Sequence, residues 1–141
     1  MEDVRACVDL YMGLNPFIPS ERAQSIRFLE NAARRQELVR QIYRQNERVG
    51  WFWAKEVTLN YTAERVFSQM HFCMAARGIV AYRGIVLAHE AIEEKARTLG
   101  ISLLLSQGSH VDETNVFPRI LEKHGWERQG YACKKRLAPR E

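Results

Sequence analysis

Apolar residues in the first third of the chain recur every three to four positions, which is the spacing of amphipathic helices. A first stripe consists of Val4, Cys7, Val8 and Tyr11. It predicts a helix that ends near Gly13, followed by a turn over residues 15–19. A second stripe consists of Ala23, Ile26, Leu29 and Ala33. It predicts a second helix, with Ser20 as its N-cap and an end around residue 35.

Three strands are expected next, because β-branched and aromatic residues become frequent. Residues 38–43 and 49–57 form two such runs, and the polar residues 45–48 between them suit an antiparallel hairpin. A third run covers residues 66–74. Strict alternation along it places Val66, Met70, Phe72 and Met74 on one face and Phe67, Gln69, His71 and Cys73 on the other.

The second half of the chain alternates helices with strands. The stripe of a core-facing helix consists of Ile85, Ala88, Ile92, Ala96 and Leu99. Gly100 closes this helix, and the apolar residues 101–105 predict a strand that is covered on both faces. After a loop over residues 106–114, a short helix is expected from its cap at Asn115 to Gly125, and residues 126–129 and 131–137 are strand-like. The predicted order ααβββαβαβ(β) describes one α+β domain, residues 1–141, with mixed strand pairing.

Charge, cysteines and the N-terminus narrow the class of protein. The net charge of +4 favours an anionic partner, which can be a nucleic acid, an acidic protein or a phosphorylated cofactor. Cys7, Cys73 and Cys133 have no C-x-x-C spacing, so neither a disulfide framework nor a metal site is expected. The N-terminus lacks the basic start and apolar run of a secretion signal, and no apolar run is long enough to span a membrane. A cytoplasmic protein is therefore expected.

One segment has the composition of a phosphate-binding turn. Residues 82–85, with the sequence Tyr-Arg-Gly-Ile, are expected to turn between the third strand and the long helix. A helix amino end offers unpaired amides and a partial positive charge to a diphosphate, provided that small residues let the backbone approach. The small residues and the arginines of this segment are Gly78, Ala81, Gly84, Arg77 and Arg83.

Element order and three local matches make about the last two-thirds of the chain resemble the GNAT superfamily of N-acetyltransferases. The matches lie at residues 76–84, at residues 93–103 and at residues 115–126, which end in a Gly-aromatic pair. The resemblance implies a mixed, mostly antiparallel central sheet flanked by helices, and acetyl-CoA as the acyl donor without a metal. The cofactor-binding residues that it implies are Phe72, Cys73, Met74, Arg77, Gly78, Ala81, Tyr82, Arg83, Gly84, Ile85 and Asn115.

The implied reaction needs a base near the central strand to deprotonate an amine. His71 is the predicted base, because it sits on the third strand and its pKa can lie close to working pH. A hydrogen-bonded structural histidine is the alternative interpretation. Glu56 and Glu64, near the strand ends, are the other candidates for the base.

The general acid of many relatives is missing from this sequence. Leu121 stands four residues before the Gly-aromatic pair, where those relatives carry a tyrosine, so Tyr131 or His124 is the candidate replacement. Arg83 and Ile85 also occupy positions where small residues are expected. These departures leave open a GNAT-like domain that has lost catalysis and acts through contacts with another protein, for example a host factor.

Two further groups of residues have more than one interpretation. Trp51, Phe52 and Trp53 suit either the lining of a groove or, as is usual on a hairpin, core packing. Basic residues would form a nucleic-acid-binding face if they converged in space. They are Arg34, Arg35, Arg40, Arg44, Arg48, Lys134, Lys135 and Arg136. The sequence therefore predicts an N-acetyltransferase with an open choice of acceptor, small molecule or protein, and it is compatible with a homodimer.

Overall fold

The computed structural model describes residues 2–14, 21–59, 63–107, 116–129 and 132–138. In these ranges, helices and strands follow one another in the order ααβββαβαββ, as predicted from the sequence. The helices are α1 (Glu2–Leu14), α2 (Arg22–Arg34), α3 (Gly78–Thr98) and α4 (Val116–Lys123). The strands are β1 (Leu38–Arg44), β2 (Glu47–Thr58), β3 (Arg65–Met74), β4 (Leu103–Gln107), β5 (Glu127–Gln129) and β6 (Ala132–Arg136). No helix in these ranges is both long and apolar enough to cross a membrane.

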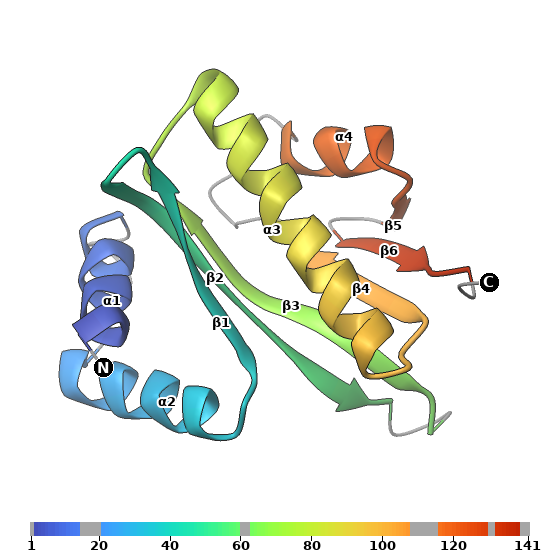
Figure 1. The fold of residues 1–141 in the computed structure, drawn as a ribbon, viewed down its shortest axis with the longest axis horizontal. Coiled ribbons are helices and arrows are strands. Elements are labelled where there is room, and N and C mark those ends of the chain that lie inside the picture. Colours follow the sequence, from blue (N-terminus) through green and yellow to red (C-terminus); the bar gives the residue numbers. More distant parts are fainter. Residues whose placement is uncertain (1, 15–20, 60–62, 108–115, 130–131, 139–141) are drawn as a thin grey trace.

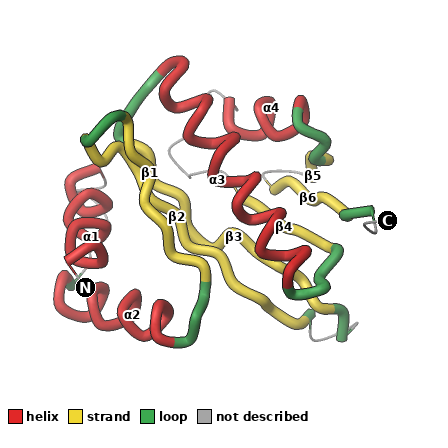
Figure 2. Tube along the Cα trace, in the orientation of Figure 1, coloured by secondary structure: helices red, strands yellow, loops and turns green. Residues whose placement is uncertain are grey.

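One six-stranded sheet forms the middle layer of the described structure, in the order β1-β2-β3-β4-β6-β5. β3 and β4 pair in parallel, and the other neighbouring strands pair in antiparallel fashion. Helices α1 and α2 pack on one face of the sheet, and α3 and α4 pack on the other (Figures 1 and 2). This mixed, mostly antiparallel sheet between helices confirms the predicted fold class.

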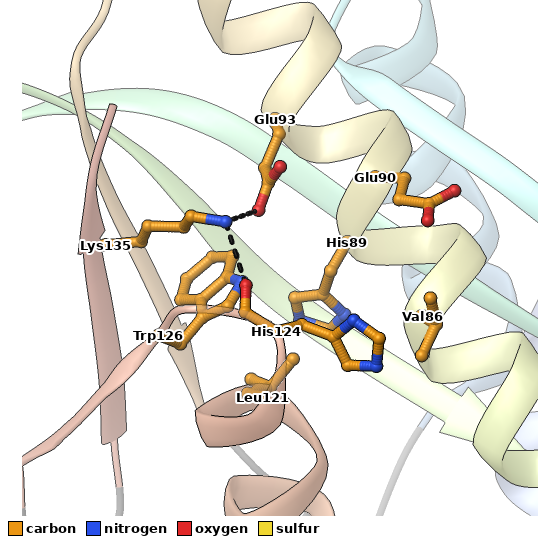
Figure 3. Close-up of a pocket in the computed structure, with 8 residues that line it drawn as sticks. All are labelled: Val86, His89, Glu90, Glu93, Leu121, His124, Trp126 and Lys135. Atoms are coloured by element: carbon orange, nitrogen blue, oxygen red, sulfur yellow. Dashed lines mark hydrogen bonds and ion pairs between the residues drawn. The ribbon is translucent and has the colours of Figure 1, made fainter. Parts of the chain in front are cut away.

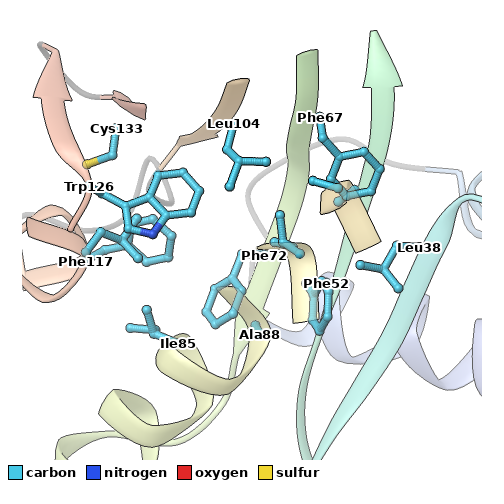
Figure 4. Close-up of a cluster of buried hydrophobic side chains, with 14 of the residues drawn as sticks. Leu38, Phe52, Phe67, Phe72, Ile85, Ala88, Leu104, Phe117, Trp126 and Cys133 are labelled. Atoms are coloured by element: carbon cyan, nitrogen blue, oxygen red, sulfur yellow. The ribbon is translucent and has the colours of Figure 1, made fainter. Parts of the chain in front are cut away.

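The two faces of the sheet bury separate apolar clusters. The larger cluster lies under α3 and α4, and Figure 4 shows Phe67, Phe72 and Phe117 within it. The smaller cluster joins α1 and α2 to the two tryptophans of β2. The aromatic run of β2 is buried and contributes to both clusters, because successive side chains of a strand point to opposite faces. Core packing, the favoured interpretation of this run, is therefore confirmed.

A β-bulge interrupts β3. Trp53 of β2 pairs with His71 and its neighbour Ala54 pairs with Gln69, so Met70 is the extra residue. One extra residue reverses the faces of all side chains that follow it. The bulge thereby bends the central strand and changes which of its side chains share a face.

The bulge overturns the strict alternation expected for this strand. Phe67 and Gln69, before the bulge, face α3, and so do Phe72 and Met74 after it. Cys73 faces α1 and α2. The expected grouping of Phe67 and Gln69 with His71 and Cys73 was therefore wrong, because a period of two holds only on either side of the bulge.

Two predicted boundaries in the first half of the chain also differ from the structure. Glu21 occupies the N-cap position of α2, with an extended backbone and no capping side chain, and Ser20 lies outside the described residues. The hairpin turn between β1 and β2 contains residues 45–46 alone, and Gln45 adopts a positive φ of 55°. The strands are thus longer than expected, because a two-residue turn is enough to connect them.

Candidate functional site

The central strands β3 and β4 part from each other. They pair from Val66 opposite Leu103 to Gln69 opposite Ser106, and β3 then continues to Met74 without a described strand on that edge. The last shared pair directly precedes the bulge, which agrees with the tendency of bulges to bend a strand and end its pairing.

After Gln69, the edge of β3 that faced β4 presents backbone groups that are not hydrogen-bonded to β2, the neighbour on the other edge. Ala75 donates its amide hydrogen to the carbonyl of Val49, a residue of β2, at 2.7 Å. Backbone groups of a strand alternate between its two edges, so the amides of Cys73 and Ala75 point towards β2. The amides of Phe72 and Met74 consequently point towards the edge that β4 has left.

The amino end of α3 follows β3 after a short turn, and within the described part of the chain it is open. Arg77 occupies the N-cap position and makes no capping hydrogen bond, and the first turn contains no acidic residue. Gly78 has a positive φ of 64°, which favours glycine. Apart from the residues next to it in the chain and the backbone of α3, no atom of the described residues lies within 4 Å of the place that a Cβ would occupy. The amides of Arg77, Gly78, Ile79 and Val80 have no partner within the helix. They give this end a partial positive charge that suits an anion.

The phosphate-binding turn predicted at residues 82–85 is wrong, because these residues lie inside α3. Gly84 is buried, and a Cβ there would overlap the Cε of Met74, so the small size of Gly84 leaves room for the end of that side chain between helix and strand. Ile85 is part of the core. Tyr82 bonds through its hydroxyl to His124 Nε2 at 3.0 Å. The real turn between strand and helix lies at residues 75–77, so it contains the predicted residue Arg77 and is followed by the predicted residue Gly78.

Three other residues of the predicted cofactor set lie away from the open helix end or face elsewhere. Ala81 is the first residue whose amide can bond within α3, and Arg83 is an exposed residue two positions further along the same helix. Cys73 faces the α1–α2 cluster, where burial raises the pKa of its thiol to about 11. Asn115 lies outside the described residues.

His71 lies on the parted part of β3 and faces α1 and α2. Its ring packs against Trp51 with centroids 5.0 Å apart and an angle of 30° between the planes. The side chain is partly buried. The structure thus places His71 on the face of the sheet opposite α3, beside the strand edge where the Phe72 and Met74 amides point.

The two glutamates proposed as alternative bases are ion-paired. Arg65 Nε donates to Glu56 Oε1 at 2.6 Å, and this hydrogen bond lowers the pKa of Glu56. Glu64 pairs with Arg136 at 3.0 Å. Both glutamates lie at the opposite end of the β2–β3 pair from Met74, so the structure does not bring them to the parted strands. Tyr131, the candidate acid, lies outside the described residues.

A buried polar chain that the sequence did not reveal lies where β3 and β4 part. His89 Nδ1 is 2.7 Å from the Ile85 carbonyl oxygen, which can only accept, so Nδ1 carries the proton. Ser106 then donates its hydroxyl hydrogen to His89 Nε2 at 2.7 Å, and the Gln69 amide group lies 3.4 Å from Ser106 Oγ. Burial lowers the pKa of His89 to about 4, and the bond to Ile85 opposes this only in part. Ser106 belongs to β4 and not to the expected loop.

Comparison with solved structures gives close overall matches. The ribosomal-protein-alanine N-acetyltransferase from Brucella melitensis superposes with a TM-score of 0.73 at 16% identity, over 96% of this chain and 95% of that one. An acetyltransferase of the GNAT family from Streptococcus pneumoniae gives 0.62 at 14% identity, over 86% and 79% of the two chains. The chain has the GNAT fold.

A third similar structure, also an acetyltransferase, is the predicted acetyltransferase from Clostridium acetobutylicum in complex with acetyl-CoA. It superposes with a TM-score of 0.64 at 13% identity, over 92% of this chain and 86% of that one. Compared by sequence, the chain matches no protein-family model and no curated protein. The likeness is therefore one of backbone architecture, and the chemistry that this GNAT fold can support depends on its own residues.

Leu121, where the sequence resemblance would place the tyrosine of many relatives, is an internal residue of this GNAT fold. Leu121 is 1% exposed and packs in the larger core. The polar group presented nearby is the Tyr82–His124 pair, which joins α3 to the end of α4. Two residues were predicted as replacements for the acid, His124 and Tyr131. Only His124 belongs to the described residues, and it lies at the surface.

The basic residues considered as a nucleic-acid-binding face do not converge. One group lies on or next to α2, β1 and β2, and the other lies on β6. Strands β3 and β4 separate the two groups in the sheet. Arg35, Lys135 and Arg136 form ion pairs with glutamates. This arrangement does not favour a nucleic-acid partner.

Proposed function

We propose that the chain is an N-acetyltransferase that takes the acetyl group of acetyl-CoA and transfers it to an amine. One observation carries the proposal: the edge of β3 that β4 leaves after Gln69 leads directly into an open, uncapped helix amino end. Free strand amides and a positive helix end, side by side, suit a ligand with an amide-rich arm and a diphosphate. The similar backbone of a structure that contains acetyl-CoA supports the same ligand.

The residues present fit acetyl-CoA. The amides of residues 77–80, together with the Arg77 guanidinium, would hold the diphosphate. The open space beside Gly78 would let the diphosphate approach the backbone. The amides of Phe72 and Met74 would bind the pantetheine arm and polarise the carbonyl. When bound, acetyl-CoA supplies a thioester as the acetyl donor. A contact from Asn115 remains part of the proposal.

His71 is the proposed general base. It lies on the face opposite α3, so an amine that approaches from the α1–α2 side would meet His71 while the donor is held from the other side. A neutral imidazole nitrogen would accept the proton of the amine. His124 or Tyr131 would return a proton to the leaving thiolate.

Binding is tested by thermal unfolding with and without acetyl-CoA. At about 100 times its dissociation constant, the ligand is expected to stabilise the fold by about 2.7 kcal/mol. Arg77→Glu is expected to abolish most of this stabilisation, because it replaces a cation by a carboxylate at the open helix end. Arg83→Glu is the matched control: it makes the same charge change at an exposed position inside the same helix and is expected to preserve the stabilisation. Equal losses in both variants, or no stabilisation of the unaltered protein, would rule out the site.

Catalysis is tested by the release of free thiol from acetyl-CoA in the presence of a panel of amines, peptides and proteins. His71→Gln is expected to lower the transfer rate by about 100-fold or more and to leave the thermal stabilisation by acetyl-CoA intact, since general base catalysis typically contributes that much. A rate that His71→Gln does not change would exclude His71 as the base.

A GNAT fold that binds another protein without catalysis is the second candidate. It is favoured by Leu121, because the position of the usual tyrosine acid is filled by a buried apolar side chain. Stabilisation by acetyl-CoA without transfer to any acceptor of the panel is the result that would support this candidate.

A further inference from the structure

A pocket of about 120 Å³ lies between α3, the end of α4 and β6. Figure 3 shows the side chains of Glu93, His124, Trp126 and Lys135 around it. Its α3 residues, at positions 86–93, are roughly two to four helical turns beyond the start of α3. The pocket is therefore separate from the open helix end where acetyl-CoA is proposed to bind.

Trp126 gives this pocket an unused hydrogen-bond donor. The side chain lines the pocket and is only 3% exposed, yet its indole Nε1–H has no hydrogen-bond partner among the described residues. An indole N–H can only donate, and a buried donor is destabilising unless it finds an acceptor. A molecule in this pocket would therefore be favoured if it presented an oxygen to Trp126.

The charged groups of the pocket define what else such a molecule must carry. Lys135 Nζ donates to Glu93 Oε1 at 2.5 Å and to the His124 carbonyl at 2.9 Å. Glu90 also lines the pocket and has no ion-pair partner within the described part of the chain. Two carboxylates thus face one ammonium group, which leaves an excess negative charge. That excess attracts a cation and repels a free anion.

We propose that this pocket binds a small amine that also carries a carbonyl or hydroxyl oxygen. The oxygen accepts the Trp126 Nε1–H, and the ammonium group donates to the carboxylate of Glu90. The volume limits the size: a cavity of about 150 Å³ accommodates benzene, so 120 Å³ suits a molecule of about five non-hydrogen atoms. Amino amides and amino alcohols meet all three conditions.

Glycinamide, protonated in buffer at about pH 6.5, is the probe. The measurement is the position of the Trp126 indole resonance in nitrogen–proton correlation spectra, assigned by through-bond experiments on the unaltered protein. We expect a saturable shift with a dissociation constant on the order of 1–10 mM, as befits a ligand of this size. The indole resonance of Trp53, which donates to Glu37 and lies on the other face of the sheet, serves as an internal control and is expected to stay in place.

Two comparisons separate the proposed contacts. Tetramethylammonium has the same charge and the same number of non-hydrogen atoms as glycinamide but no oxygen and no N–H. Acetamide has the carbonyl but no charge. Both are expected to shift the resonance little.

Glu90→Gln is expected to weaken glycinamide binding about tenfold, because a charge-assisted hydrogen bond becomes a neutral one. Glu94→Gln, on the same helix but outside the pocket, is expected to have no effect. The proposal fails if glycinamide causes no saturable shift, which would mean that the pocket holds only solvent. It also fails if tetramethylammonium shifts the indole resonance as much as glycinamide does, or if the Glu90→Gln variant binds glycinamide as tightly as the unaltered protein.

Discussion

His89 is enclosed by the core and makes hydrogen bonds that require its neutral form. It is 2% exposed, and its pKa is lowered from 6.5 to about 4 by burial. In the unfolded chain the same side chain takes up a proton below about pH 6.5. The unfolded state therefore binds more protons than the folded state between these two values. The contribution of His89 to the free energy of unfolding is complete above about pH 6.5 and is lost as the pH falls towards 4. In total it amounts to about 3 kcal/mol.

Urea denaturation at a series of pH values between 4 and 7 measures this loss. His89→Gln keeps a donor for the Ile85 carbonyl and an acceptor for the Ser106 hydroxyl. This variant is expected to show a weaker dependence of the free energy of unfolding on pH. His124→Gln, which changes an exposed histidine, is expected to retain it. If the free energy of unfolding depends on pH as steeply in His89→Gln as in the unaltered protein, other titrating groups cause the loss.

Two glycines differ in what an added methyl group would meet. A Cβ on Gly50 would lie 2.6 Å from the Cys73 carbonyl oxygen, which belongs to the paired backbone of β3. A Cβ on Gly84 would meet the mobile end of the Met74 side chain. We expect Gly50→Ala to lower the free energy of unfolding by about 2–3 kcal/mol. Gly84→Ala is expected to lower it by less than about 1 kcal/mol, because the thioether can move and alanine favours a helix. Urea denaturation distinguishes the two, and equal losses would contradict this explanation.

At the scale of elements, the bulge in β3 can be removed without turning the strand over. Gln69 and His71 pair with neighbouring residues of β2 and already face opposite sides, so deletion of Met70 would leave a regular ladder. Met70 is 41% exposed, and its loss removes little packing. We expect the deletion variant to fold but to lose most of its stabilisation by acetyl-CoA, because a straight β3 would stay closer to β4.

Met70→Ser is the control for this deletion, because it keeps the extra residue and changes only an exposed side chain. It is expected to retain the stabilisation by acetyl-CoA in thermal unfolding. If the deletion variant is stabilised as strongly as Met70→Ser, the bulge does not set the separation of the strands.

The elements themselves could be predicted because their signal is local. Helical stripes and runs of β-branched residues depend on neighbours a few positions away, and the predicted order ααβββαβαβ(β) agrees with the structure. The start of α3 could not be predicted in the same way. Gly84 looks like a turn residue in sequence, but its small size serves contact with Met74, ten residues earlier and on another element. The bulge at Met70 has no local signal either.

The candidate site was predictable where it lies on a recognisable strand or next to it. His71, Phe72 and Met74 were in the expected set and lie on the parted part of β3. Arg77 and Gly78 were in it too, and the structure puts them at the open end of α3.

The hydrogen-bonded side chains of His89, Ser106 and Gln69 were not predicted as a group. These three residues belong to separate elements and meet only after the sheet and α3 have packed. One sequence signal was present: His89 lies on the buried stripe between Ala88 and Ile92, where a polar residue requires partners.

At the scale of the whole molecule, two cores of unequal size share one sheet. The core under α3 and α4 contains nineteen buried residues in the described part of the chain, and the core under α1 and α2 contains nine. The described ion pair between α1 and α2, Arg22 with Asp9, is exposed and contributes little. Local opening takes place where the fewest buried contacts must be broken. The α1–α2 layer is therefore expected to open while the rest of the molecule stays folded.

The buried thiols on the two faces can measure this difference. Cys7 belongs to the smaller core and Cys133 to the larger, and each can be kept as the single cysteine with alanine at the other two positions. Under native conditions, the labelling rate of each thiol reports the free energy of the opening that exposes it. We expect the value for Cys133 to equal the global free energy of unfolding from urea denaturation of the same variant, and the value for Cys7 to be lower by about 2 kcal/mol or more. Equal values for both thiols would mean that the two cores open together, as a single cooperative unit around the shared sheet.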